Sequence, residues 1–267
     1  MKKKDKRILG AGAVLLGSVV FSLCCKKDEP PPSPVVVAQG AAAQKMLTPE
    51  PVAPPPSGTA AIRGTVTLTG TPPEMPLTKR DADPFCARTP MKDQEVVVGP
   101  GGGLQNVIVR ITKGITGNYE PPMTNVTLDQ TQCMYKPRVA VIMAGQSLLV
   151  RNSDQTLHNI HGYKGTSTLF NQAEVPGLPA IAKTFKDATG EILKFKCDVH
   201  PWMTAYVGVM GHPFFAVTGP DGKYEIPKVP AGKYTVEAWH ERFGTKSQEV
   251  TVEAGKPLAL AFSFDSK

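Results

Sequence analysis

The sequence predicts an all-β fold made of two small sandwiches. Three observations predict it. Short stretches of alternating or β-branched residues recur after residue 60. Turn signals such as Asp221-Gly222 and Ala231-Gly232 separate these stretches, and the sequence shows no long amphipathic helical pattern. The 26 prolines and 25 glycines also favour short strands joined by turns.

The expected strands follow one another at close spacing. In chain order they are residues 62–69, 96–98, 107–111, 126–128, 139–143, 147–151, 158–163, 181–185, 191–197, 205–210, 214–217, 223–226, 234–239, 246–252 and 258–264. The Gly-rich run 99–103 lacks the Lys and Ser/Thr of a phosphate-binding loop, so it is interpreted as a turn. Residues 163–180, rich in Gly, Asn and Pro, are expected to be a connection between strands.

The net charge of +7 is concentrated at the N-terminus. The first 27 residues hold seven basic side chains and one acidic one, so +6 of the +7 belongs to this segment. The remainder is close to neutral. The net charge of the chain after residue 27 therefore gives no electrostatic reason to expect nucleic-acid binding.

Residues 1–25 have the features of an export signal. A basic start precedes an apolar run of 16 residues, which is shorter than the roughly 20 residues of a membrane span. Cys24 closes the run and resembles the lipidated cysteine of bacterial lipoproteins; Cys25 is the other candidate acceptor, and a plain signal peptide or an uncleaved anchor is the alternative. Residues 26–59, rich in Pro and Ala, are expected to be a disordered tether. We therefore expect an exported protein of the periplasm or cell envelope, lipid-anchored to a membrane.

One tract carries the side chains that are most indicative of function. Cys197, His200 and Met203 follow one another at C-x2-H-x2-M spacing, and His158 lies 39 residues before Cys197. A thiolate, two imidazoles and a weak thioether form the ligand set that favours copper cycling between two oxidation states. Structural zinc prefers four Cys or His ligands and fits less well. His161 is an alternative to His158, and His200 is expected to have an edge near solvent in an apolar patch.

Residues 124–210 resemble the cupredoxin family, in particular its amicyanin-like and plastocyanin-like members. The resemblance rests on His-Asn-Ile-His after a polar turn, followed by Cys-x2-His-Pro-aromatic-Met. It implies a Greek-key sandwich that holds one type 1 copper ion. The implied equatorial ligands are His158, Cys197 and His200, and the implied axial ligand is Met203. Asn159 would tie the two ligand loops together by hydrogen bonds, with Pro201 and Trp202 beside the ligands.

The remaining cysteines form a second expectation. Cys86, Cys133 and Cys197 are three in number, and disulfides persist in an exported protein. Two thiols pair and one is left over. Because Cys197 has a place in the metal-binding pattern, Cys86 and Cys133 are the expected disulfide.

The segments on either side of this tract resemble two parts of one carboxypeptidase regulatory-like (prealbumin-like) domain. Opening strands are found at 62–66 and 106–109, and the closing part at 216–236 includes Asp-Gly-Lys-Tyr and Val-Pro-Ala-Gly-Lys-Tyr-Thr-Val. The resemblance implies a second small sandwich of prealbumin or immunoglobulin-like type. The expected organisation is 60–117 and 211–267 as one sandwich, interrupted by the cupredoxin at 118–210. Independent modules are the alternative.

The expected function is electron transfer and not catalysis, because the ligand set leaves no open position for a substrate. We expect a mononuclear type 1 copper protein that carries one electron between redox partners of the cell envelope. Such partners would be c-type cytochromes or a periplasmic oxidoreductase. The alternatives are copper storage, delivery or sensing, and a glycan- or protein-binding module with incidental copper.

Overall fold

The computed structural model describes residues 58–266, which form four β-sheets and two 3-10 helices. The helices are η1 (Cys86–Arg88) and η2 (Pro100–Gly102), the second lying in the turn predicted at 99–103. None of the helices in this part of the chain is long and apolar enough to cross a bilayer. The predicted leader 1–25, the lipidation at Cys24 and the tether up to residue 57 lie outside the described residues. The predicted all-β fold class is confirmed.

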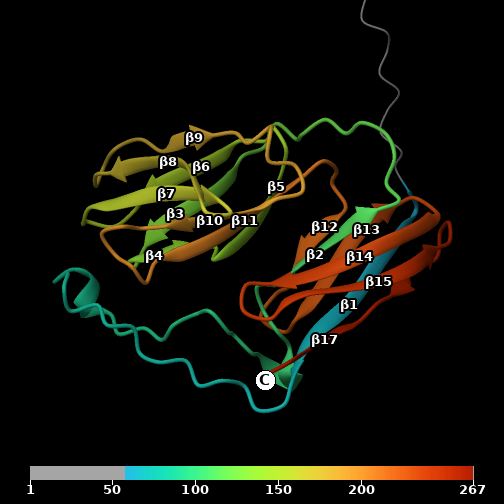
Figure 1. The fold of residues 1–267 in the computed structure, drawn as a ribbon, viewed down its shortest axis with the longest axis horizontal. Helices are drawn as coiled ribbons and strands as arrows, with labels where there is room; N and C mark the ends of the chain where they lie inside the picture. The colour runs from blue at the N-terminus through green and yellow to red at the C-terminus, as the bar shows by residue number, and fades with distance from the viewer. Residues whose placement is uncertain (1–57, 267) are drawn as a thin grey trace, which may run out of the picture. The chain divides into compact units, whose positions relative to one another are not determined.

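Both ends of the described chain build one sandwich, here called the flanking sandwich (Figure 1). Its strands are β1 (Ala60–Thr69), β2 (Ile108–Lys113), β12 (Phe215–Val217), β13 (Lys223–Val229), β14 (Gly232–His240), β15 (Gly244–Val252), β16 (Leu258–Ala259) and β17 (Phe262–Asp265). In one sheet, β1 pairs antiparallel with β13 and parallel with β16 and β17. The other sheet has the order β12-β2-β14-β15. Because β1 pairs with strands from the far end of the chain, the flanking sandwich is split; the boundaries at 117 and 211 stay predictions.

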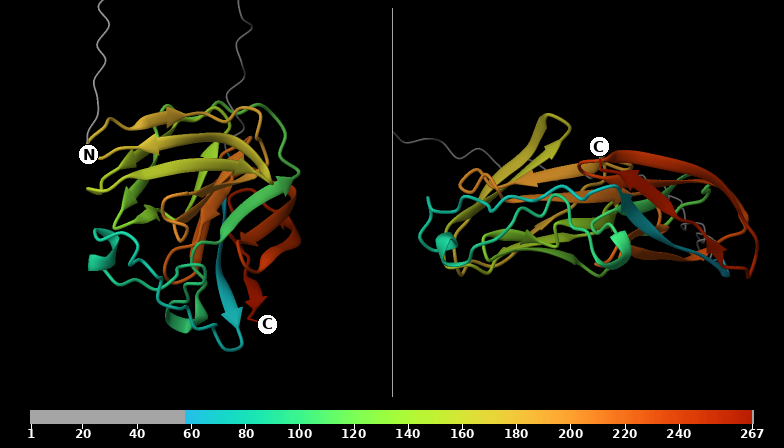
Figure 2. Two further views of the ribbon diagram at one scale, coloured as in Figure 1. Left: turned by 60° about the vertical axis from the view of Figure 1, so that its left-hand side comes forward. Right: turned by 90° about the horizontal axis from the view of Figure 1, so that it is seen from below.

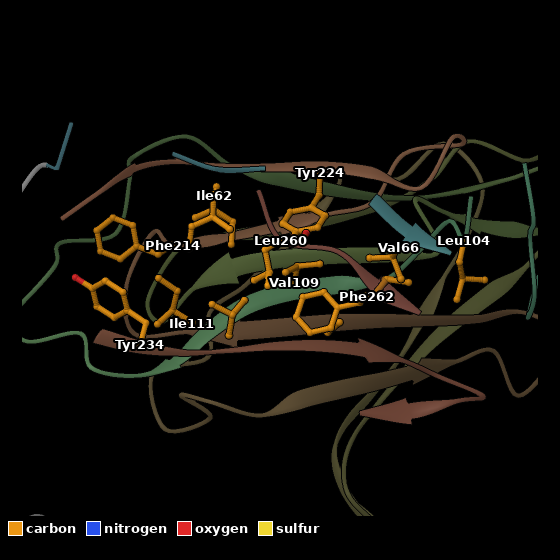
Figure 3. Close-up of a cluster of buried hydrophobic side chains, with 14 of the residues drawn as sticks. Ile62, Val66, Leu104, Val109, Ile111, Phe214, Tyr224, Tyr234, Leu260 and Phe262 are labelled. Carbon is orange, nitrogen blue, oxygen red and sulfur yellow. The ribbon is translucent and has the colours of Figure 1, made fainter. Parts of the chain in front are cut away.

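The flanking sandwich is closed by apolar side chains from both of its sheets. Ile62 and Val66 of β1 are fully buried, whereas Arg63 between them is exposed. Figure 3 shows the same two side chains in one cluster with Val109 and Ile111 of β2. Removing this apolar surface from water is the main driving force for the sandwich.

The inserted sandwich lies between β2 and β12 in the sequence. Its strands are β3 (Val126–Thr131), β4 (Met134–Lys136), β5 (Val139–Met143), β6 (Leu148–Asn152), β7 (His158–Lys164), β8 (Ser167–Glu174), β9 (Ile181–Lys183), β10 (Ile192–Lys196) and β11 (Thr204–Met210). Its two sheets have the orders β5-β11-β10-β7-β8 and β4-β3-β6-β9. The parallel pairs β5–β11 and β3–β6 require connections that cross between sheets, as in a Greek key. The two views of Figure 2 show both sheets.

An apolar contact and a buried ion pair connect the two sandwiches. All five residues of β5 are buried, and two of them, Val139 and Val141, pack in one cluster with Ile108 of β2. Directly before β5, Nε and Nη2 of Arg138 donate to the two carboxylate oxygens of Glu241 at 2.5 and 2.8 Å. The two side chains are only 7% and 4% exposed, which keeps this pair away from screening by solvent.

Two expectations about strands were wrong, and one strand was not predicted. Residues 163–180 are not a plain connection, because Ser167–Glu174 forms the edge strand β8. Most of its side chains are polar or exposed, so it lacks the apolar alternation that marks a strand with one buried face. The three-residue strand β4 was also missed. Residues 96–98 form no strand; Val98 makes a single bridge to Leu104 across the Gly-rich turn.

His240, at the end of β14, should make the flanking sandwich less stable in weak acid. The ring is 1% exposed, and burial, together with Arg138 and Arg242, lowers the pKa of His240 to about 4. The unfolded chain takes up this proton near pH 6.5, whereas the folded chain does so only near pH 4. The histidine should therefore cost about 2 kcal/mol of unfolding free energy between pH 8 and pH 5. Urea unfolding at both pH values measures this loss, and His240→Asn should remove it; an unchanged pH dependence in the variant would contradict the assignment.

Candidate metal centre

The loop between β10 and β11 carries three of the predicted ligands in seven residues, Cys197 to Met203. The strands pair antiparallel up to Lys196 and Thr204, so the loop closes directly on the last rung of the ladder. Within it, the amide of Met203 donates to the carbonyl of His200 at 2.9 Å, and the amide of Cys197 donates to the carbonyl of Met203 at 3.3 Å. The local backbone therefore holds thiol, imidazole and thioether at one end of the inserted sandwich.

The strand register brings the fourth predicted ligand to the same end. β7 pairs antiparallel with β10, and His161 lies opposite Lys196. Since neighbouring positions run in opposite directions in such a pair, residue 158 at the start of β7 lies beside the loop. His158 is fully buried there.

The side chains of His158, Cys197 and His200 converge. One donor atom from each of the three lies within 4.8 Å of the others. The two Nδ1 atoms of the imidazoles are 2.8 Å apart, and the Sγ atom of Cys197 is 3.8 Å from Nδ1 of His200. All three side chains are buried, and Met203 is fully buried in the same apolar cluster as Cys197.

Each imidazole is hydrogen-bonded to a carboxylate through Nε2, the nitrogen that faces away from the other imidazole. Nε2 of His158 is 3.0 Å from Oδ2 of Asp154, and Nε2 of His200 is 3.0 Å from Oδ2 of Asp83. A carboxylate accepts, so Nε2 carries the proton in each ring. A neutral ring then has no proton at Nδ1, and each Nδ1 presents a lone pair to the other.

This arrangement suits a cation. Two nitrogen lone pairs at 2.8 Å, with a sulfur close by, repel one another unless a proton or a metal ion lies among them. Consistent with this need, the pKa of His158 is raised: burial lowers it, but the hydrogen bonds and charges of Asp154 and Cys197 outweigh burial. Two imidazole nitrogens and one sulfur, with a thioether buried nearby, are donors that fit copper.

The surroundings of Cys197 favour its thiolate, which is the form that binds metals. Burial raises the pKa of this thiol, but hydrogen bonds with His158, His200 and the amide of Asn159 lower it to about 6. The amide of Asn159 donates to Sγ at 3.4 Å. Its side-chain oxygen accepts from the amide of Asp198 at 2.6 Å, so Asn159 connects the start of β7 with the cysteine loop.

His161 lies apart from this cluster. It is three positions from His158 along a strand, which turns its side chain to the opposite face. There Nδ1 of His161 lies 3.0 Å from a carboxylate oxygen of Asp198, and its Nε2 lies 2.9 Å from the hydroxyl of Thr168. The structure therefore groups His158, and not His161, with Cys197 and His200.

The other predicted residues lie around the loop. The indole nitrogen of Trp202 donates to the carbonyl of Cys133 at 3.0 Å, and its ring is centred 5.0 Å from the ring of His200. Pro201 is exposed. Cys86 and Cys133 form a disulfide, which leaves Cys197 as the free cysteine of residues 58–266.

The expectation of a solvent-exposed edge on His200 is wrong. This residue is 1% exposed, because residues 78–91 cover its outer edge. Sequence reasoning also missed both carboxylates. Asp154 had a weak signal, since it lies four residues before His158 in a polar turn, but Asp83 lies 117 residues before His200 and had none.

Comparisons with known proteins find one matching family model and several similar solved structures. Residues 203–265 match the family model of the carboxypeptidase regulatory-like domain. No curated protein matches the chain. Among solved structures, a purple cupredoxin from Nitrosopumilus maritimus is 22% identical, with a TM-score of 0.28, and the match covers 32% of this chain and 98% of that one.

Two further solved structures are similar to parts of the same chain. Amicyanin from Paracoccus versutus is 22% identical with a TM-score of 0.29, covering 38% of this chain and 96% of that chain. A copper-containing nitrite reductase from Thermus scotoductus SA-01 is 19% identical with a TM-score of 0.28, covering 38% of this chain and 25% of that chain. The chain is thus similar to cupredoxins among solved structures, and the match to the regulatory-like domain begins at Met203, inside the inserted sandwich.

Proposed function

We propose that the protein binds one copper ion of type 1 and carries single electrons between redox partners of the cell envelope. The observation that carries this proposal is the convergence of Cys197 with two imidazoles whose Nδ1 atoms face each other at 2.8 Å. Copper bound among these donors would supply a one-electron change between Cu(II) and Cu(I). The buried thioether of Met203 is the proposed axial ligand.

The protein's own hydrogen bonds favour a carrier. Asn159 fixes the cysteine loop, and Asp154 and Asp83 fix the two rings, so the donor positions are set without the metal. Donors that are already in place move little when the charge of the ion changes, and a small rearrangement favours fast electron transfer. The donors are also buried, which leaves little room for a substrate and supports a carrier over an enzyme.

The partners and location belong to the same proposal. c-type cytochromes or a periplasmic oxidoreductase would supply and accept the electron. Lipidation at Cys24 would anchor the protein to a membrane, and the Pro-rich segment after it would hold the folded part away from that surface. Both features are proposed from the sequence.

Addition of Cu(II) to the purified metal-free protein tests the function. We expect one equivalent to give an intense blue, green or purple absorption that ascorbate bleaches and a mild oxidant restores over repeated cycles. EPR spectroscopy of the oxidised form should show a single mononuclear copper species. Colourless Cu(I) binding with ready transfer to a chelator would contradict the carrier and favour storage or delivery. If the protein bound neither Cu(II) nor Cu(I) tightly, the copper function would be contradicted. The alternative of a binding module, carried by the flanking sandwich, would then be favoured.

A further inference from the structure

Residues 78–91, here called the strap, reach from the flanking sandwich to the metal centre. At its base, the amide of Thr78 donates to the carbonyl of Met91 at 2.8 Å. The strap is part of the connection between β1 and β2, and Figure 1 shows this connection, in blue-green, running out past β4. The strap therefore belongs by sequence to one sandwich and by contact to the other.

The strap is attached to the inserted sandwich at two points. Cys86 is bonded to Cys133 next to β4. The guanidinium of Arg80 donates to the carbonyls of Thr89 and Gln132 and lies 5.9 Å from the centre of the Trp202 ring. Arg80 is only 4% exposed, so this contact is an internal part of the fold.

Between these two points the strap presents one carboxylate to the metal centre. Oδ1 of Asp83 accepts from the amides of Phe85 and Cys86 at 2.7 and 3.2 Å, which fixes the side chain on its own backbone. Oδ2 accepts from the hydroxyl of Thr156 at 2.7 Å and from Nε2 of His200 at 3.0 Å. The side chain of His200 is 2% exposed, so Asp83 and the disulfide occupy the place where solvent would reach the ring.

We propose that Asp83 is a positioning residue for His200, and that the strap thereby seals and electrically biases the metal centre. Its carboxylate fixes the proton of His200 on Nε2 and leaves Nδ1 free to bind the metal. A negative partner on the outer N–H makes the ring a stronger donor. A fixed negative charge near the metal also favours the more highly charged ion, Cu(II), over Cu(I). This inference rests on the proposed copper function.

The variant Asp83→Asn tests the proposal with little change in shape. Asparagine keeps an oxygen that accepts from the amides of Phe85 and Cys86, but it removes the charge. We expect about a 10-fold or greater loss of Cu(II) affinity, a smaller loss of Cu(I) affinity and hence a higher reduction potential. Asp81→Asn is the matched control, because it removes the same charge from an exposed position of the same strap. Asp83→Glu, which keeps the charge, should restore part of the difference.

A second measurement uses the metal-free protein. In protein labelled with nitrogen-15 at histidine, NMR should show His200 protonated on Nε2, with a ring proton that exchanges slowly with water. Asp83→Asn should speed this exchange and lower the population of that tautomer, and Asp81→Asn should leave both unchanged. If Asp83→Asn failed to fold, Thr156→Val, which removes a neighbouring donor from the same carboxylate, should shift the exchange in the same direction.

The outcomes separate the two proposals. Wild-type protein that binds no copper, but shows the predicted effect on the His200 proton, overturns the function and keeps the role of Asp83. Wild-type protein that binds copper, with Asp83→Asn and Asp81→Asn equal in potential and proton exchange, overturns the role of Asp83 and keeps the function.

Discussion

Replacing Cys197 with serine is expected to abolish the intense visible absorption and to lower copper affinity by more than about 100-fold, beyond the loss typical for residues that only support a ligand. The absorption of such a site arises from charge transfer between a thiolate and Cu(II). The pKa of Cys197, about 6, makes the thiolate available near neutral pH. A serine hydroxyl stays protonated there and is a harder donor, which copper prefers less. Optical spectra and competition with a copper chelator measure both effects.

The fold should tolerate this change, so the loss can be assigned to the sulfur. Sγ of Cys197 accepts from the amide of Asn159 at 3.4 Å, and in its protonated form it donates to the side-chain oxygen of Asn159 at 3.3 Å. A serine hydroxyl can form both hydrogen bonds. The metal-free variant should therefore unfold at nearly the wild-type temperature. Met203→Leu is the control within the same loop, and it should keep the absorption with a shifted maximum. Full colour in the serine variant would show that the metal binds elsewhere.

The part of the site that could be predicted is local in sequence. Cys197, His200 and Met203 lie in one loop, and antiparallel strand order returns His158 to the same end of the sandwich. Four ligand types in this order, with an asparagine directly after the first histidine, indicate a metal site more specifically than any one short motif does. The two-residue period of a strand places His158 and His161 on opposite faces, but the sequence chose His158 by family resemblance, and the register of β7 against β10 was needed to group it with the loop.

The part that could not be predicted depends on long-range placement. Asp83 carries no motif, and its contact with His200 spans 117 residues. The expected Cys86–Cys133 disulfide contained a clue, since it ties the neighbours of Cys86 to the inserted sandwich. Its consequence for the exposure of His200 still required the path of the strap in three dimensions. The ligand motif, which involves only the inserted sandwich, therefore predicts a solvent-exposed edge on His200. In the structure, the strap covers that edge.

Strands were predictable where the residues are apolar or β-branched and difficult where the strand is polar or very short. β5 matches its predicted bounds, and its five side chains are all apolar. β8 was missed because an edge strand with exposed polar side chains has the composition of a loop. Burial alone does not separate the missed strands from the found ones: β4 is buried but, with three residues, too short to show a pattern, and β15 was found although most of it is exposed.

Removing the disulfide by the double substitution Cys86→Ala and Cys133→Ala should lower the free energy of unfolding by about 4 kcal/mol, the chain-entropy value for a loop of this length. The bond spans 47 positions, from the strap to the turn before β4. Both half-cystines are buried, and because both are replaced, the double variant adds no new unpaired thiol beside His200. Urea unfolding of the metal-free protein measures the loss. A decrease below about 1 kcal/mol would mean that Arg80 and the base of the strap already hold it in place without the bond.

The same variant should weaken the coupling between Asp83 and the metal centre. With the tether cut, the contacts of Arg80 and Asp83 and the packing of Phe85 still hold the strap against the inserted sandwich, but no covalent bond does. Amide hydrogen exchange should therefore rise in residues 78–91 more than in β10 and β11. Asp83→Asn should also change the reduction potential less in the disulfide-free background than in the wild type, because the carboxylate spends less time on His200. An equal change in both backgrounds would show that Asp83 holds its position through Thr156 and His200 alone.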